Sequence, residues 1–114
     1  CKGEIPMIKE IHSIEDFDKE ITNHSGYALI DFWATRCPPC RMMAPVLKGA
    51  EERIGDKISF CKIDVDEQQE LAGRFDIMSI PTFVIFKDGK EIDRLSGYRP
   101  LDDFMNALKE IIKE

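Results

Sequence analysis

One stretch of the sequence passes from an apolar strand pattern through two cysteines into a helix pattern: Tyr27-Ala-Leu-Ile-Asp-Phe-Trp-Ala-Thr-Arg-Cys-Pro-Pro-Cys-Arg-Met-Met-Ala-Pro45. The spacing of Cys37 and Cys40 places both sulfurs on one side of the first helical turn. Their Cα atoms then come within the roughly 4.4–6.8 Å that a disulfide requires. The sequence therefore predicts a pair that opens and closes a local disulfide.

The two cysteines are expected to differ in reactivity. Cys37 stands at or just before the start of the helix, where unpaired backbone N–H groups and the helix dipole favour an anion. This position favours the thiolate, which is the form that attacks disulfides. Cys40 lies inside the first turn and is expected to be more shielded. We therefore assign Cys37 as the nucleophile and Cys40 as the resolving thiol.

The spacing alone leaves two other uses of a Cys-x-x-Cys pair open, a metal or cluster site and a purely structural disulfide. A structural zinc usually takes four ligands. The missing ligands would have to come from a second chain or from Cys1, Cys61, His12 and His24. None of these residues forms a second closely spaced pair, so the pattern favours redox catalysis and no metal site is predicted.

Several separated motifs resemble those of thioredoxins over almost the full length of the chain. They are Asp31-Phe-Trp-Ala-x-x-Cys-x-x-Cys-Arg-Met-x-Ala-Pro45, Ser79-Ile-Pro-Thr-Phe83 and Lys87-Asp-Gly89, in this order. The resemblance implies an α/β thioredoxin fold with a central mixed sheet of about four to five strands, flanked by about four helices. Thioredoxins usually carry Trp at the position of Arg36 and Gly at that of Pro38. These departures are expected to affect the redox potential and the choice of partner.

The composition is that of an ordinary globular domain. A chain of 114 residues is long enough to bury a core. It carries 22 acidic and 16 scattered basic residues, for a net charge of -6, which argues against nucleic-acid binding. No apolar run approaches the ~20 residues that span a bilayer, so no transmembrane segment is predicted.

Residues 1–7 are expected to be an N-terminal extension of a single thioredoxin domain formed by residues 8–114. Met7 is a natural start, so the residues before it indicate a removed leader or a tag. An N-terminal cysteine is also what a bacterial lipoprotein presents after its leader is cut. We expect a cytoplasmic protein, with the bacterial envelope and a lipid anchor at Cys1 as the alternative.

The hydrophobic pattern elsewhere predicts further strands and helices. An edge strand is expected at 8–11, a buried strand at 58–65, and a hairpin at 82–96 with Asp88-Gly89 as its turn. Two helices are expected to have Ser13 and Asp66 as their N-caps. A third is expected to begin at about residue 39, and a last one to have Pro100 at its first helical position.

Asp31 interrupts an apolar run, residues 27–34, that is typical of a strand covered on both faces. Burial would raise the pKa of this carboxyl and make it a proton acceptor, the alternative being a solvent-facing acid at a strand end. In thioredoxins the matching acid lies beneath the resolving cysteine and helps to deprotonate it, so the resemblance implies this role for Asp31. It also implies that Lys62 lies close to Asp31 and adjusts the pKa of its carboxyl. The alternative is that Lys62 is a surface lysine.

The resemblance further implies a substrate-binding surface around the cysteines. In the family, the proline matching Pro81 is cis and faces the active cysteine, and the residue before it presents its backbone to an extended substrate. A cis peptide bond has a low free-energy cost only before proline. The alternative is a turn with a trans bond before Pro81. Gly97 is expected near the site, where it leaves room for a partner backbone. The predicted substrate-binding residues are Trp33, Arg36, Pro38, Pro39, Ile80, Pro81 and Gly97.

The implied reaction is two-step thiol–disulfide exchange on protein disulfides. The resemblance implies a thioredoxin reductase as electron donor, no bound cofactor and a monomer. Arg36 and Arg41 flank the pair, and a cation that lowers the thiolate pKa by one unit makes the pair about 30 mV more oxidising. Because that step is small, we expect a reductase, with an envelope disulfide oxidant or isomerase as the alternative.

Overall fold

The computed structural model describes residues 8–113, and the expected extension at 1–7 lies outside the described residues. The strands form one sheet in the order β1-β3-β2-β4-β5. They are β1 (Lys9–Glu10), β2 (Tyr27–Trp33), β3 (Ile58–Asp64), β4 (Thr82–Lys87) and β5 (Lys90–Ser96). The helices are α1 (Ile14–Phe17), continued by a π-helical segment (Asp18–Thr22), α2 (Pro38–Ile54), α3 (Gln69–Arg74) and α4 (Leu101–Ile112). The predicted α/β class and the mixed sheet are confirmed.

The sheet is parallel on one side and antiparallel on the other. Both β1 and β2 pair parallel with β3, whereas β4 pairs antiparallel with β2 and with β5. The central strand β2 therefore has neighbours on both edges, as its apolar run predicted. In this register Asp31 lies between Lys62 of β3 and Phe83 of β4.

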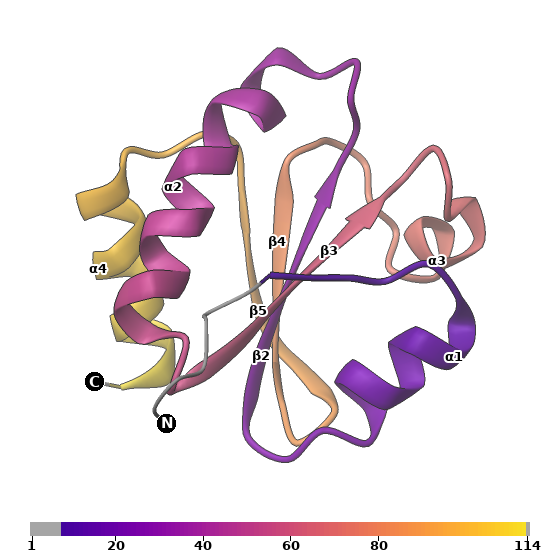
Figure 1. The fold of residues 1–114 in the computed structure, drawn as a ribbon, viewed down its shortest axis with the longest axis horizontal. Coiled ribbons are helices and arrows are strands. Elements are labelled where there is room, and N and C mark those ends of the chain that lie inside the picture. Colours follow the sequence, from indigo (N-terminus) through magenta and orange to yellow (C-terminus); the bar gives the residue numbers. More distant parts are fainter. Residues whose placement is uncertain (1–7, 114) are drawn as a thin grey trace.

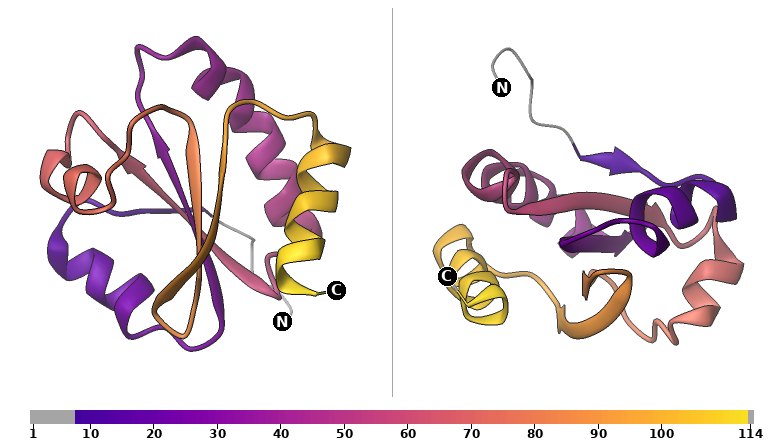
Figure 2. Two further views of the ribbon diagram at one scale, coloured as in Figure 1. Left: turned by 180° about the vertical axis from the view of Figure 1, so that it is seen from behind. Right: turned by 90° about the horizontal axis from the view of Figure 1, so that it is seen from below.

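Helices cover both faces of the sheet. In Figures 1 and 2, α2 and α4 pack on one face and α1 and α3 lie on the other. Side chains alternate along a strand, so β2 contributes Leu29 to the core beneath α2 and α4 and Ile30 to the core beneath α1 and α3. Each fully buried side chain of this size contributes about 1.5–3 kcal/mol. Asp31, two residues after Leu29, faces α2.

Two predicted helix starts were wrong. α3 begins at Gln69 with Gln68 as its N-cap, not with Asp66. The backbone N–H of Asp66 is instead bound by the Asp64 side chain, 2.9 Å away. Pro100 is the N-cap of α4 rather than its first helical residue. The cap predicted at Ser13 is confirmed, since its hydroxyl accepts a hydrogen bond from the Asp16 N–H.

The hairpin of β4 and β5 turns at Asp88-Gly89, as predicted. Both turn residues have positive φ, 51° and 82°, which is the conformation that a tight hairpin turn requires. The Asp88 N–H donates to the Gly26 carbonyl, 2.9 Å away, and the Asp88 carboxylate accepts from the Gly26 N–H at 2.7 Å. The turn is thereby fixed to the loop that leads into β2.

Replacing Gly89 by alanine is expected to lower the free energy of unfolding by about 1–3 kcal/mol. The added Cβ would lie 2.6 Å from the Thr22 carbonyl oxygen, and alanine rarely adopts φ +82°. Urea unfolding measures the change. The matched control is Gly73→Ala in α3, where a Cβ meets nothing within 4 Å and helix propensity favours alanine by up to about 1 kcal/mol. Equal losses in the two variants would contradict this explanation.

Candidate active site

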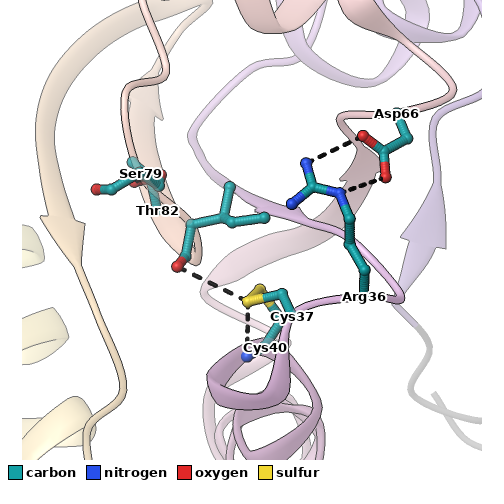
Figure 3. The surroundings of a disulfide bond; sticks show 7 residues. Arg36, Cys37, Cys40, Asp66, Ser79 and Thr82 are labelled. Atoms are coloured by element: carbon teal, nitrogen blue, oxygen red, sulfur yellow. Dashed lines mark hydrogen bonds and ion pairs between the residues drawn. A yellow bond between two sulfur atoms is a disulfide. The ribbon is translucent and has the colours of Figure 1, made fainter.

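Cys37 and Cys40 form a disulfide at the start of α2, with their Cα atoms 5.2 Å apart. Cys37 is the N-cap of the helix, and its extended backbone turns the chain from the β2 loop into Pro38 and Pro39. Its sulfur accepts a hydrogen bond from the Cys40 N–H at 3.2 Å (Figure 3). Neither proline has an N–H, so the Cys40 amide is the first that the helix can offer to this sulfur.

The two cysteines lie in a small apolar cluster. Ala34 is buried with them, and Trp33, Val65 and Ile80 pack against it. Cys37 is 7% exposed and Cys40 is 3% exposed, so the expected difference in shielding is present but small. Pro38 and Pro39 are exposed beside them. The two prolines are therefore accessible from solvent at the start of α2, next to the nearly buried sulfurs.

The loop before β4 lies against the Cys37 sulfur. The Ile80–Pro81 peptide bond is cis, as expected. The Ile80 carbonyl oxygen is 3.8 Å from the Cys37 sulfur, and the Thr82 hydroxyl closes the loop by donating to the Ser79 carbonyl at 2.6 Å. In the reduced protein, the Cys37 thiol can donate to this Ile80 oxygen.

Gly97 joins this loop from the far end of β5. Its N–H donates to the Pro81 carbonyl at 2.8 Å. It has φ +86°, and a Cβ placed there would meet nothing within 4 Å. The predicted open space beside the proline is therefore present.

Asp31 is buried, with 1% of its surface exposed, which excludes the solvent-facing alternative. Its Oδ1 has no hydrogen-bond partner among residues 8–113. Burial raises the pKa of this carboxyl to about 7, while the Lys62 charge lowers it and Glu10 raises it slightly. An acid with this pKa can take up a proton near neutral pH.

Lys62 lies beside Asp31 in the parallel register of β2 and β3, on the same face of the sheet. Its Nζ is held 4.4 Å from the centre of the Trp33 ring, a cation–π contact. Both side chains are half-buried. Lys62 is therefore not a free surface lysine, and its charge acts on Asp31 from a position above Trp33.

Arg36 makes a paired contact that the sequence analysis missed. Its Nε and Nη2 donate to the two carboxylate oxygens of Asp66 at 3.0 and 3.1 Å (Figure 3). Because Asp66 balances its charge, Arg36 is a weaker source of positive potential at Cys37 than we expected. The signal was present in the sequence: β2 and β3 are parallel and end at one edge, so the residues just beyond them, Arg36 and Asp66, meet there.

Comparison with known proteins settles the family. A protein-family model for thioredoxin matches residues 8–110. The chain belongs to the thioredoxin family. A thioredoxin from Listeria monocytogenes is 47% identical over 106 residues, which cover 93% of this chain and 100% of that protein. A Bacillus subtilis thioredoxin is 45% identical over 89 residues, 78% of this chain and 82% of its own length.

The fold agrees with a solved thioredoxin structure. The Malassezia sympodialis thioredoxin superposes with a TM-score of 0.85 at 36% identity, covering 95% of this chain and 93% of that one. A thioredoxin whose Cys37 and Cys40 can form a disulfide is a thiol–disulfide oxidoreductase that acts on protein disulfides. Thioredoxins work without a bound cofactor. Between residues 8 and 113, the side chains of His, Cys, Asp and Glu nowhere gather in threes around a point where a metal could bind. No helix in this range is both long and apolar enough to cross a membrane.

Proposed function

We propose that this thioredoxin works as a general protein-disulfide reductase, with Cys37 as nucleophile, Cys40 as resolving thiol and Asp31 as proton acceptor. The observation that carries the proposal is the position of the Cys37 sulfur. It caps α2, accepts the Cys40 N–H and lies beside the Ile80 carbonyl, on the more exposed side of the pair. The helix N-terminus favours its thiolate, the attacking form.

The reaction runs in two exchanges. The Cys37 thiolate attacks one sulfur of the substrate disulfide, which forms a mixed disulfide and releases the other substrate sulfur as a thiolate. Cys40 then loses its proton to Asp31 and attacks the Cys37 sulfur. The Cys37–Cys40 bond forms, the second substrate thiol leaves, and two electrons have passed from the dithiol to the substrate. Lys62 tunes the proton affinity of Asp31 through its charge.

The substrate lies across Cys37 as an extended segment. The exposed Pro38 and Pro39 flank one side of the sulfur, and Trp33 packs against the cluster that contains both cysteines. On the other side, Ile80 presents its backbone beside the cis Pro81, and the space at Gly97 admits the partner's main chain. Arg36 contributes to the same surface from the start of the turn.

The partners and setting are proposed from the family. A thioredoxin reductase regenerates the dithiol, and the protein acts as a monomer formed by one domain, residues 8–114, in the cytoplasm. The similarity to thioredoxins of Listeria monocytogenes and Bacillus subtilis supports this setting. A lipid anchor at Cys1 in a bacterial envelope remains the alternative, and Cys1 lies outside the described residues.

The reduction potential of the Cys37–Cys40 pair tests the proposal. Because Asp66 neutralises Arg36, we expect a value near the −270 mV typical of thioredoxins. Equilibration with a dithiothreitol series and thiol counting measures it, and the Cys61→Ser protein is the control because Cys61 is buried outside the site. A value of about −120 to −180 mV would instead indicate disulfide formation or shuffling.

A further inference from the structure

Lys62 lies between two carboxylates on one face of the sheet. The parallel registers place it opposite Asp31 of β2 and Glu10 of β1, and neighbouring strands are only about 4.8 Å apart. Within residues 8–113, however, no hydrogen bond or ion pair joins the Lys62 ammonium to either acid. Its Nζ lies 4.4 Å from the centre of the Trp33 ring instead. The ammonium therefore rests on an indole although its flexible stem could bring it to a carboxylate.

The Trp33 ring is held by the surroundings of the disulfide. Trp33 follows Asp31 by two positions on β2, so the two side chains point to the same face of the sheet. The half-buried ring packs against the cluster that contains both cysteines. Its Nε1 has no hydrogen-bond partner among residues 8–113, so packing rather than a hydrogen bond sets the orientation of the ring. The position of the ring face in turn fixes where the Lys62 ammonium lies.

The position of this ammonium decides how strongly Asp31 holds a proton. Burial raises the pKa of the Asp31 carboxyl to about 7, while the Lys62 charge lowers it and Glu10 raises it. The attraction between two opposite charges increases as they approach, and it is strongest where water is excluded. An ammonium that moved from the ring to the carboxylate would lower this pKa further and make the carboxylate a weaker base.

The other elements packed against Asp31 bring few charged groups to it. Its partner on β4 is Phe83, and the buried side chains of α4 are apolar. The buried titratable groups of α2 are Cys40, in the first turn, and Glu51. Glu51 lies about three turns further along the helix, roughly 16 Å from the start of α2. Lys62 is therefore the cation whose placement matters most for Asp31.

We propose that Trp33 is a positioning residue for the second exchange, because its ring holds the Lys62 ammonium away from Asp31 and so keeps that carboxylate able to accept the proton of the resolving thiol. The proposal rests on the role given to Asp31 in the proposed function. In that step the S–H bond of Cys40 breaks, an O–H bond forms on Asp31, and the sulfur keeps the electron pair with which it attacks Cys37.

Trp33→Leu tests the proposal, because leucine removes the ring face and keeps an apolar side chain. The freed ammonium is expected to approach the buried Asp31 rather than the exposed Glu10, where water screens the attraction. The titration midpoint of Asp31, followed by NMR of carboxyl-labelled aspartate in the oxidised protein, should fall by about one pH unit, a tenfold loss of proton affinity. An unchanged midpoint would overturn the proposal, whereas the role of Asp31 is tested separately by Asp31→Asn.

The rate of the second exchange is the functional readout. Above the midpoint, the decay of the mixed disulfide should be about threefold slower in Trp33→Leu than in the wild type, because a weaker base accepts the proton. If the midpoint falls but the decay keeps its wild-type rate, the proton step assigned to Asp31 fails, and the positioning role fails with it.

Lys62→Met shows whether Trp33 acts through the ammonium. This variant removes the charge that lowers the pKa of Asp31, so the midpoint is expected to rise. Adding Trp33→Leu to Lys62→Met should then cause no further change. If Trp33→Leu lowers the midpoint equally in both backgrounds, the ring acts through burial alone and the proposal is wrong. Trp33→Phe keeps a ring face, and its midpoint should lie close to that of the wild type.

A matched control lies at the other end of β2. The Nζ of Lys87 is 4.9 Å from the centre of the Tyr27 ring, which is a second cation–π contact on the same strand. Tyr27→Leu removes this contact far from Asp31 and should leave the titration midpoint unchanged. A shift as large as that of Trp33→Leu would contradict the proposal.

A measurement on the wild-type protein covers the case in which Trp33→Leu does not fold. Because the end of the Lys62 side chain lies over the indole, the ring current of Trp33 is expected to move the NMR signals of the Lys62 ε-methylene protons upfield. Signals at the position of an exposed lysine would overturn the proposal.

Discussion

Replacing Cys37 by serine is expected to abolish disulfide reduction, with a loss in rate on the order of 10⁴-fold or more. The Cys37 sulfur is the atom at the helix N-terminus that the Cys40 N–H and the Ile80 carbonyl surround. A serine hydroxyl is not ionised near neutral pH and does not form a mixed disulfide. Reduction of a protein disulfide, followed as the release of thiols, measures the loss.

Replacing Cys40 by serine is expected to have a different outcome, because the first exchange remains intact. Cys37 still attacks, but no second thiol releases the substrate, so the mixed disulfide accumulates. Mass spectrometry under non-reducing conditions detects it as an adduct on Cys37. If the adduct forms on Cys40 in the Cys37→Ser protein instead, the assignment of the two roles is reversed.

The control for both variants is Cys61→Ser. Cys61 is buried on β3, and burial raises the pKa of its thiol to about 12, so it has almost no thiolate at neutral pH. This variant should reduce substrates at the wild-type rate. Cys1 is replaced by serine in every protein of the series, so that adducts report only on the Cys37–Cys40 pair.

The sequence was sufficient to predict the elements whose pattern is local. The apolar run at 27–34 became the central strand β2, Asp88-Gly89 formed the hairpin turn, and the Cys-x-x-Cys spacing placed Cys37 at the start of α2. Each of these features depends on residues that are neighbours in the chain. Backbone geometry and periodicity fix them without knowledge of the rest of the fold.

The parts that were missed depend on contacts between distant residues. Aspartate is a common N-cap residue, which is why Asp66 was predicted to begin a helix. Its carboxylate instead binds Arg36, 30 residues earlier. A local pattern gives no account of such pairings until the sheet order is known.

Replacing Asp31 by asparagine is expected to stabilise the protein at pH 8 by about 4 kcal/mol. Burial raises the pKa of the Asp31 carboxyl to about 7 in the folded protein, whereas an exposed carboxyl in the unfolded chain ionises near pH 4. Between these two values the unfolded chain has released a proton that the folded protein still holds. The contribution of Asp31 to the free energy of unfolding is therefore fully present below about pH 4. It decreases by about 1.4 kcal/mol per pH unit between about pH 4 and pH 7, and it is lost above pH 7.

Urea unfolding of both proteins from pH 4 to pH 8 measures this difference. Asparagine stays neutral, so the variant should match the wild type at pH 4 and exceed it progressively as the pH rises. Asp56→Asn is the control, because Asp56 is exposed in the turn after α2 and its replacement should not change the pH dependence. Parallel stability curves for the wild type and Asp31→Asn would contradict the raised pKa.

The same substitution is expected to slow the second exchange, because Cys40 loses its proton acceptor. In the wild type, the decay of the mixed disulfide should accelerate as the pH passes about 7, where Asp31 becomes ionised. In Asp31→Asn this step at pH 7 should be about 10²-fold slower. A variant that is more stable and resolves more slowly would show that the buried carboxylate of Asp31 is retained for the reaction at a cost in stability. A variant that is more stable and resolves at the wild-type rate would leave Asp31 as a source of strain with no part in the exchange.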